Sequence, residues 1–417
     1  MRILFLTSRM PSPPVGGDRF RVYHLLRTAA EAGHRVDLVT FDDGRSDRSA
    51  LEPLRRFTSS YEIVHQPKLV SWWNAARALP TQLPLQAAYY RSEEMSRRVA
   101  RAFDRNRPDV VYTHLFRMAP YALAEQGRRD ARWILDLTDV ISGGIERSLP
   151  YRRAPQQWLY REEGRRIARY EALVAPRFDD CWVISEAEAR ALGALAPRAS
   201  ILVVSNGFEP ERNIVAPSRR AASLLFFGNH DVLHNRDAAR FLVTEILPLV
   251  RKSIPEATLD IAGKGAEGLG SWVRRPGVRV LGFVPDLDRE LRRASLFVAP
   301  HRFAAGVQNK VLQALSAGTP VVTTPVVHQG LAPAPDDILG VGEDASAIAA
   351  QVVVLLRDPQ EAERMGERGR VWACARFNWR GSLAAFEGRP TAAAPADEGA
   401  RAETPAAARI AVAGAVV

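Results

Sequence analysis

The sequence predicts an α/β protein made of two doubly wound domains, each built around a parallel sheet. Short strands rich in β-branched residues alternate with amphipathic helices, the pattern typical of βαβ units. This alternation stops in a polar run after residue 205 and then starts again, which indicates a boundary between two domains. With 417 residues, of which 47% are hydrophobic, the chain is long enough to bury two separate cores.

Residues 1–210 are expected to form the N-terminal domain. Each predicted strand is a short run of branched or aromatic residues, and each predicted helix has one apolar face. Gly33 follows the first helix, where glycine readily adopts the left-handed conformation that ends many helices. Strands are expected at 3–7, 36–40, 62–65, 110–114, 133–137, 181–184 and 201–204, and helices at 19–32, 92–105, 119–126 and 155–173.

Residues 220–371 are expected to form the C-terminal domain, in which the same pattern returns. The Ala/Pro-rich tail at 388–417 has no periodic apolar face, so we expect it to be disordered. Strands are expected at 223–227, 258–262, 278–281, 296–299 and 321–324, and helices at 237–252, 287–293, 346–357 and 360–376.

The lengths of the apolar runs and the number of cysteines indicate in which cellular compartment the protein is expected. The apolar run near the start, residues 3–6, is far too short for a signal peptide core or a membrane span, and no other stretch approaches the necessary length. Cys181 and Cys374 lie in hydrophobic contexts and are expected to be reduced core residues, not a disulfide or a metal site. We therefore expect a cytoplasmic protein.

The formal net charge of +10 is concentrated in a basic stretch that runs from Arg152 to Arg169. With Trp158 and its apolar neighbours among the arginines, a helix here could make a peripheral contact with an anionic membrane, at the inner face. The alternative is an ordinary solvated face on which Glu162 and Glu163 pair with arginines. Nucleic acid is not an expected partner, because no nucleic-acid-binding module is recognisable.

The stretch AGVQNKVLQALSAGTPVV, residues 305–322, carries the strongest indication of a binding site. A loop with glycine opens a helix, so backbone N–H groups and the positive end of the helix dipole point at one place. Such a place binds anions, and a lysine in the first turn adds positive charge. We expect Gly306, Val307 and Lys310 to hold a phosphate or diphosphate.

The loop after the first strand contains Gly16 and Gly17, which let a backbone approach a ligand closely. We expect these glycines to approach the same diphosphate, although a plain loop made rigid by prolines is an alternative. The spacing is not that of a dinucleotide-binding fingerprint, which argues against a nicotinamide or flavin cofactor.

Two polar residues follow strands of the N-terminal domain. His114 ends the predicted strand at 110–114 and could hydrogen-bond a sugar hydroxyl or a phosphate, unless it is a core histidine bonded to the backbone. Asp139 follows the next strand and could line the same wall. Ligands of open α/β sheets bind beyond the carboxyl ends of the strands, which is where these residues are expected.

Small residues also follow successive strands of the C-terminal domain, where they would leave a surface on which a nucleotide can lie. Lys264, in the second of these turns, could meet a diphosphate. Asp286 and Asp288 have a spacing seen in metal-dependent sugar transferases, but Asp286 is better placed to cap the helix at 287–293, so no metal is expected. The turn residues proposed to contact the nucleoside are Gly228, Gly282, Phe283 and Val284.

Several segments together resemble family 4 glycosyltransferases of the GT-B fold, and more narrowly the enzymes encoded with exosortase-associated (PEP-CTERM) exopolysaccharide systems. The resemblance extends from about residue 1 to 386. Its specific parts are PSPPVGGDR and GVQNKVL, whereas SNG and SAGTPVV are general to the fold. The segments LLFFGNHDVLHNRDAARFLVTEILPLV and VRVLGFVPDLDRELRRASLFVAP also resemble the family. The resemblance implies two Rossmann-like domains that face each other across a cleft, with a final helix at about 372–387 that crosses back to the N-terminal domain.

The resemblance also implies a function. In this family the C-terminal domain binds a nucleotide sugar, the N-terminal domain binds the acceptor, and most members retain the anomeric configuration without a metal or other cofactor. His114 matches a histidine that faces the donor sugar. Two glutamates of the family fall on Ala305 and Gln313, and Gln313 can still hydrogen-bond the ribose. The acceptor would be a glycan or a polyprenyl-linked saccharide.

Two other functions remain open from the sequence. A nucleotide-sugar epimerase could use the same fold, with Asp139 as one of its acid–base groups. A non-catalytic protein that binds nucleotide sugars or glycans would explain the non-acidic residues at 305 and 313.

Overall fold

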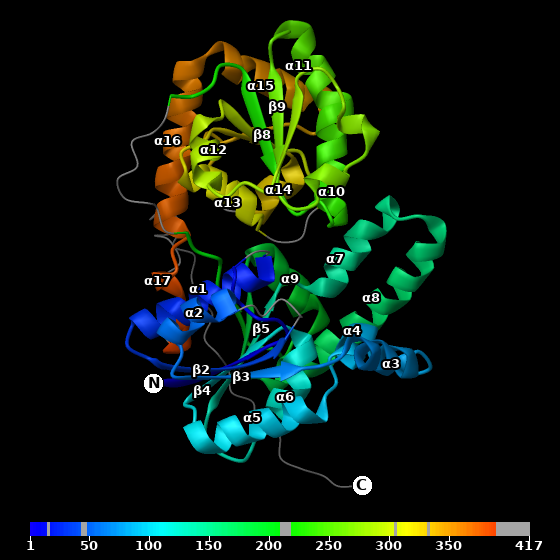
Figure 1. The fold of residues 1–417 in the computed structure, drawn as a ribbon, viewed down its shortest axis with the longest axis vertical. Helices are drawn as coiled ribbons and strands as arrows, with labels where there is room; N and C mark the ends of the chain where they lie inside the picture. Colours follow the sequence, from blue (N-terminus) through cyan, green and yellow to red (C-terminus); the bar gives the residue numbers. More distant parts are fainter. Residues whose placement is uncertain (15–16, 43–47, 209–217, 304–306, 332–333, 389–417) are drawn as a thin grey trace, which may run out of the picture.

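The computed structural model describes residues 1–14, 17–42, 48–208, 218–303, 307–331 and 334–388. It contains two parallel sheets, each covered by helices on both faces, in two lobes that lie one above the other (Figure 1). The predicted fold class, two Rossmann-like α/β domains, is therefore confirmed. The Ala/Pro-rich tail beyond residue 388 lies outside the described residues.

The N-terminal sheet has seven parallel strands in the order β3-β2-β1-β4-β5-β6-β7. Its strands are β1 (Arg2–Thr7), β2 (Arg35–Asp42), β3 (Ser60–His65), β4 (Val110–His114), β5 (Arg132–Thr138), β6 (Asp180–Val183) and β7 (Ile201–Val203). Its helices are α1 (Gly17–Glu31), α2 (Arg48–Phe57), α3 (Lys68–Ala78), α4 (Leu85–Tyr89), α5 (Glu93–Asn106), α6 (Ala119–Leu123), α7 (Ile141–Ser148), α8 (Ala154–Val174) and α9 (Glu186–Leu195).

Alternation along β1 builds both faces of this domain. Ile3 and Phe5 are buried in one cluster, whereas Leu4 and Leu6 are buried in the other, because successive side chains of a strand point to opposite faces. This is why a strand covered on both sides appears in the sequence as an unbroken apolar run.

The C-terminal sheet has six parallel strands in the order β10-β9-β8-β11-β12-β13, around one large core. Its strands are β8 (Ser223–Phe227), β9 (Thr258–Ala262), β10 (Val278–Gly282), β11 (Leu296–Ala299), β12 (Val321–Thr323) and β13 (Gly340–Val341). Its helices are α10 (Leu233–Phe241), α11 (Leu247–Ser253), α12 (Leu287–Arg293), α13 (Asn309–Ser316), α14 (Pro325–Gly330), α15 (Ala345–Arg357) and α16 (Pro359–Arg376), and a π-helical turn at Leu242–Ile246 joins α10 to α11.

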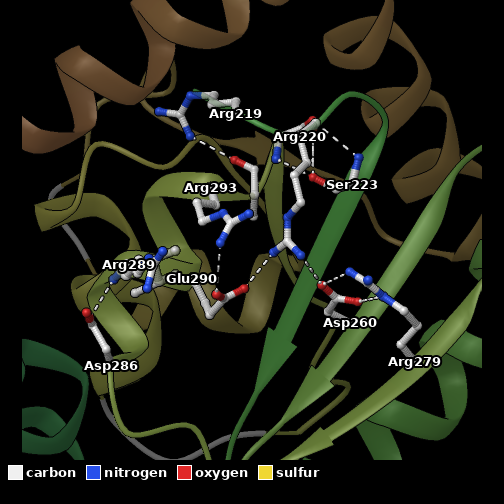
Figure 2. Close-up of polar contacts among 12 residues, drawn as sticks. Arg219, Arg220, Ser223, Asp260, Arg279, Asp286, Arg289, Glu290 and Arg293 are labelled. Atoms are coloured by element: carbon white, nitrogen blue, oxygen red, sulfur yellow. Dashed lines mark hydrogen bonds and ion pairs between the residues drawn. The ribbon is translucent and has the colours of Figure 1, made fainter. Parts of the chain in front are cut away.

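A network of arginines and carboxylates connects several elements of the C-terminal domain (Figure 2). The buried carboxylate of Asp260 accepts hydrogen bonds from Arg279 at 2.7 Å and pairs with Arg220 at 3.1 Å. Arg220 also pairs with Glu290 of α12 at 2.6 Å, which ties the segment before β8 to that helix. Asp286 accepts a hydrogen bond from the N–H of Arg289 at 2.9 Å, so its predicted role as the N-cap of α12 is confirmed.

The chain returns to the N-terminal domain through α17 (Arg380–Phe386), within the stretch at about 372–387 where the crossing helix was expected with a turn at Trp379. Residues up to Arg376 belong to α16, and the helix breaks at Phe377–Trp379 before α17 starts. Phe386 then packs on the N-terminal sheet, with its ring centroid 4.8 Å from that of Trp182.

The two connections between the lobes lie against each other. The N–H of Phe208 donates to the carbonyl of Phe377 at 2.9 Å. A Cβ on Gly207 would lie 2.3 Å from the backbone N of Trp379, so only glycine fits where the returning chain passes. This close approach accounts for the glycine of the SNG segment.

Candidate functional site

A cavity of about 1270 Å³ lies between the two lobes. Because all the strands are parallel, their carboxyl ends gather at one edge of each sheet, and the cavity is formed where these two edges face each other. The segments after β1, β8 and β9 and the first turns of α1 and α13 contribute to its lining.

The first turn of α13 forms one wall of the cavity, with Val307, Asn309 and Lys310 among the lining residues. The ammonium group of Lys310 donates to Oε1 of Gln308 at 2.8 Å, and His301 Nε2 lies 3.4 Å from the same nitrogen. Burial lowers the pKa of Lys310 to about 7. In its protonated form, a partly desolvated lysine at the start of a helix can bind an anion, and a bound anion would favour that protonated form.

Two residues predicted beside Lys310 lie outside the described residues. These are Gly306 and Ala305, which precede α13. Gly16 is also outside them, whereas Gly17 begins α1 and lines the cavity. A Cβ on Gly17 would lie 3.6 Å from the side-chain amide of Asn309, so α1 and α13 approach each other closely here.

The turns after β8, β9 and β10 line the cavity on the same lobe as α13. The cavity is lined by four residues that were predicted to contact the nucleoside, namely Gly228, Phe283, Val284 and Gln313. Phe283 is 67% exposed, which leaves its ring open for stacking.

Gly282 is not among the lining residues. It has a φ of +67°, and a Cβ there would lie 2.0 Å from a carboxylate oxygen of Glu267, so its requirement for glycine is explained by the β10 turn itself. Lys264 lines the cavity, but its ammonium group pairs with Asp231 at 2.6 Å. A predicted diphosphate contact by Lys264 would have to compete with that carboxylate.

The structure places His114 under the surface of the N-terminal domain. The side chain is buried and is not among the lining residues of the cavity. Its Nε2 lies 3.4 Å from the hydroxyl of Thr138, and burial lowers its pKa to about 4. A neutral imidazole in this position can orient Thr138, while its predicted role toward the donor sugar stays a prediction.

Asp139 does line the cavity. Its Oδ1 is buried and has no hydrogen-bond partner among the described residues. Burial, with a smaller effect of Glu188, raises its pKa to about 7. A carboxylate with these properties can bind a hydroxyl group and take up its proton near neutral pH.

Sequence reasoning missed several charged residues that line the cavity, namely Arg9, Arg19, Lys68, Asp18 and Asp42. With Lys264, Lys310 and Asp139, the described lining carries five Lys or Arg residues against three Asp residues. Arg9 lies two residues after the end of β1, so the strand-end rule that selected Gly16 and Gly17 applies equally to Arg9. The excess of positive charge favours an anionic ligand.

A buried chain of hydrogen bonds, also missed, joins the lobes beside this cavity. Arg21 of α1 donates from Nε to Asp136 of β5 at 2.6 Å and from Nη1 to Oδ1 of Asn206 at 2.9 Å. Asn206 then donates to Oδ1 of Asn309 at 2.7 Å, one residue before Lys310. The chain therefore holds the first turn of α13 against the N-terminal domain.

Comparison with known proteins places the two lobes in one enzyme family. A model of the "glycosyl transferase 4-like domain" matches residues 16–207, and a model of "glycosyl transferases group 1" matches residues 221–358. The two matches cover the two sheets in turn. The chain belongs to family 4 of the glycosyltransferases, which have the GT-B fold.

Relatives and solved structures agree with this assignment. The glycosyltransferase is 27% identical to the glycogen synthase of Mycobacterium tuberculosis, over 91% of this chain and 92% of that relative. Its fold is similar to that of the sucrose-phosphate synthase of Thermosynechococcus elongatus (TM-score 0.68, 18% identity, 93% of this chain and 98% of that one). It is also similar to HepE of Anabaena in complex with UDP (TM-score 0.66, 15% identity, 93% and 100%).

Proposed function

We propose that the protein transfers a sugar from a nucleoside-diphosphate sugar to a hydroxyl group of a glycan or lipid-linked acceptor, in the synthesis of an exopolysaccharide or another cell-surface polysaccharide. The observation that supports this most is the inter-lobe cavity with Lys310 at the start of α13 and an excess of cationic lining residues. A diphosphate is the part of such a donor that these groups recognise. HepE, of similar fold, was solved with UDP, which makes UDP the first probe.

In this proposal the C-terminal lobe binds the donor. Lys310 and the backbone before α13, with Val307 and Gly306, would hold the diphosphate and stabilise the negative charge that builds up on it as the bond to the sugar breaks. Phe283 would stack on the base, and Gln313 would reach the ribose. Positive charge from the protein replaces a metal ion in this proposal.

The N-terminal lobe would present the acceptor. Its hydroxyl oxygen forms the new bond to the anomeric carbon, on the face from which the diphosphate leaves, so that the configuration is retained. Asp139, whose Oδ1 lacks a partner among the described residues, would hold that hydroxyl and receive its proton. His114, which is buried under the surface of the lobe, would act indirectly by orienting the hydroxyl group of Thr138.

A turnover assay tests the proposal. The purified protein is incubated with UDP-, GDP- and ADP-sugars, with and without glycan or polyprenyl-linked acceptors. We expect release of the nucleoside diphosphate that depends on the acceptor, and a product heavier by one sugar. A new nucleotide-sugar isomer formed without acceptor would indicate an epimerase, and binding without any turnover would indicate a binding protein.

The lowered pKa of Lys310 predicts that UDP binding depends on pH. Only the ammonium form attracts the diphosphate. Binding therefore raises the pKa of this lysine above the value of about 7 that it has in the protein without UDP. Affinity should therefore fall by up to about tenfold per pH unit above about pH 7. Calorimetry in buffers of different ionisation enthalpy should show proton uptake on binding in this range.

The range above about pH 7 suits this test because the second phosphate ionisation, with a pKa of about 6, is then complete. Lys310→Arg is the matched control. A guanidinium stays charged throughout, so the affinity of this variant should be nearly independent of pH. A wild-type affinity that stays constant from about pH 7 to about pH 9 would contradict the role given to Lys310.

A further inference from the structure

The helix α3 exposes an unusual set of apolar side chains. Leu69 is 84% exposed, Trp72 66% and Trp73 64%, and Val70 and Leu79 are also exposed. Only small residues of α3, namely Ser71, Ala75 and Ala78, are buried. The helix therefore packs through a narrow face and turns its large apolar residues outward, the reverse of a normal surface helix. We call Leu69, Val70, Trp72, Trp73 and Leu79 the α3 patch.

The surroundings of the α3 patch are basic. Residues 63–92 contain Lys68, Arg77 and Arg91 and no acidic residue. From α8, Arg166 donates to the carbonyl of Leu79 at 2.9 Å, and Arg169 donates to the side chain of Gln82. Arg166 is partly balanced by Glu162 at 3.1 Å, whereas Lys68 and Arg77 are exposed on α3 itself.

The α3 patch is connected to the candidate site. Lys68 and Leu69, at the start of α3, line the inter-lobe cavity, and so does Tyr89 of α4. The ring of Tyr89 contacts Trp72 edge-on, with centroids 5.5 Å apart. An apolar and aromatic surface thus leads from the cavity to the outer side of α3, which Figure 1 shows at the edge of the N-terminal domain beside α4 and α8.

We propose that the α3 patch docks on an anionic membrane surface and brings the cavity to a membrane-anchored acceptor. The proposal rests on the proposed function for the nature of that acceptor. Tryptophan prefers the interface between headgroups and acyl chains, and flanking Lys and Arg residues bind anionic lipids. The saccharide of such an acceptor would enter the cavity past Tyr89, while its lipid stays along α3.

A second copy of this chain is a less suitable occupant than a membrane. Two α3 patches placed face to face would bring Lys68 and Arg77 of one copy close to the same residues of the other. An anionic lipid surface is complementary to that charge. No helix of the described residues is long and apolar enough to cross a bilayer, so the contact would be made from one side.

Vesicle binding tests this proposal with the full chain. We expect cosedimentation with vesicles of phosphatidylglycerol and phosphatidylethanolamine, weak binding to phosphatidylcholine vesicles, and loss of binding at high salt. A double variant, Trp72→Ser with Trp73→Ser, should lower the partition coefficient at least tenfold. Trp158→Ser is the matched control, because Trp158 on α8 is 73% exposed but lies outside the α3 patch.

Three results would overturn the proposal: undiminished vesicle binding by the double variant, a loss caused instead by Trp158→Ser, or dimerisation through α3 in analytical ultracentrifugation without vesicle binding. UDP affinity and the unfolding temperature of the double variant should match those of the wild type, which shows that its fold and donor site are intact. Failure of the proposed function is seen separately, as a wild type that binds vesicles but neither binds UDP nor transfers sugar.

Discussion

Replacement of Lys310 by methionine is expected to weaken UDP binding by one to two orders of magnitude. Hydrogen bonds to charged groups contribute about 1.5–3 kcal/mol, and each 1.4 kcal/mol corresponds to about a tenfold change in affinity. Lys310 is partly buried at the start of α13, so its interaction with a diphosphate is weakly screened by solvent. Methionine keeps most of the aliphatic chain, and isothermal titration with UDP measures the loss.

Lys264→Met is the control for this effect. Lys264 also lines the cavity, but it is more exposed and already paired with Asp231, so its removal should change UDP affinity less than about fivefold. Equal losses for the two variants would show that any lysine in the cavity suffices. An unchanged UDP affinity for Lys310→Met would remove the central contact of the proposed donor site.

The largest expected effect on stability comes from Asp136→Ala. The Arg21–Asp136 pair is completely buried, and Tyr112 and the N–H of Thr138 also donate to the Asp136 carboxylate. Removing the carboxylate leaves the guanidinium of Arg21 buried without its counter-charge, at a cost of about 3–5 kcal/mol. Urea denaturation followed by tryptophan fluorescence should show the unfolding transition of the N-terminal lobe at much lower urea.

Two further variants test whether the loss of stability comes from the unpaired charge of Arg21 or from the loss of any carboxylate or of packing. Glu94→Ala removes a carboxylate from an exposed surface cluster and should leave the free energy of unfolding nearly unchanged. The double variant Arg21→Met with Asp136→Leu replaces the buried charges by apolar groups and should regain most of the lost stability. A double variant as unstable as Asp136→Ala alone would mean that shape, not unpaired charge, is what Asp136 provides.

The alternation of strands and helices was predictable because parallel strands buried on both faces appear as unbroken apolar runs. The segment SLLFF of β8 and the segment ILFLT within β1 are such runs. The start of α13 was predictable for a related reason, since a loop, a lysine and an apolar helical face are all local in sequence. Strand-end positions then pointed to Asp139, Gly228 and Phe283, which do line the cavity.

Features that depend on distant residues could not be predicted in the same way. The hydrogen bonds of Arg21 join positions that are 115 and 185 residues apart in the chain. The helix α3 was not among the predicted helices, and its large apolar residues face solvent while only small residues are buried, which sequence periodicity alone does not show. His114 ends a strand as predicted, but packing around Thr138 buries its ring, which a strand-end rule alone does not show.

The contact between Phe208 and Phe377 has a consequence for motion between the lobes. Among the described residues, the chain passes from one sheet to the other before β8 and again before α17, and Phe208 of the first passage touches Phe377 of the second. We expect a rotation of one lobe relative to the other to have its axis near this contact. A substitution at Gly207 would therefore act on the angle between the lobes as a whole, and its effect would be seen in small-angle scattering before it is seen in the chemistry.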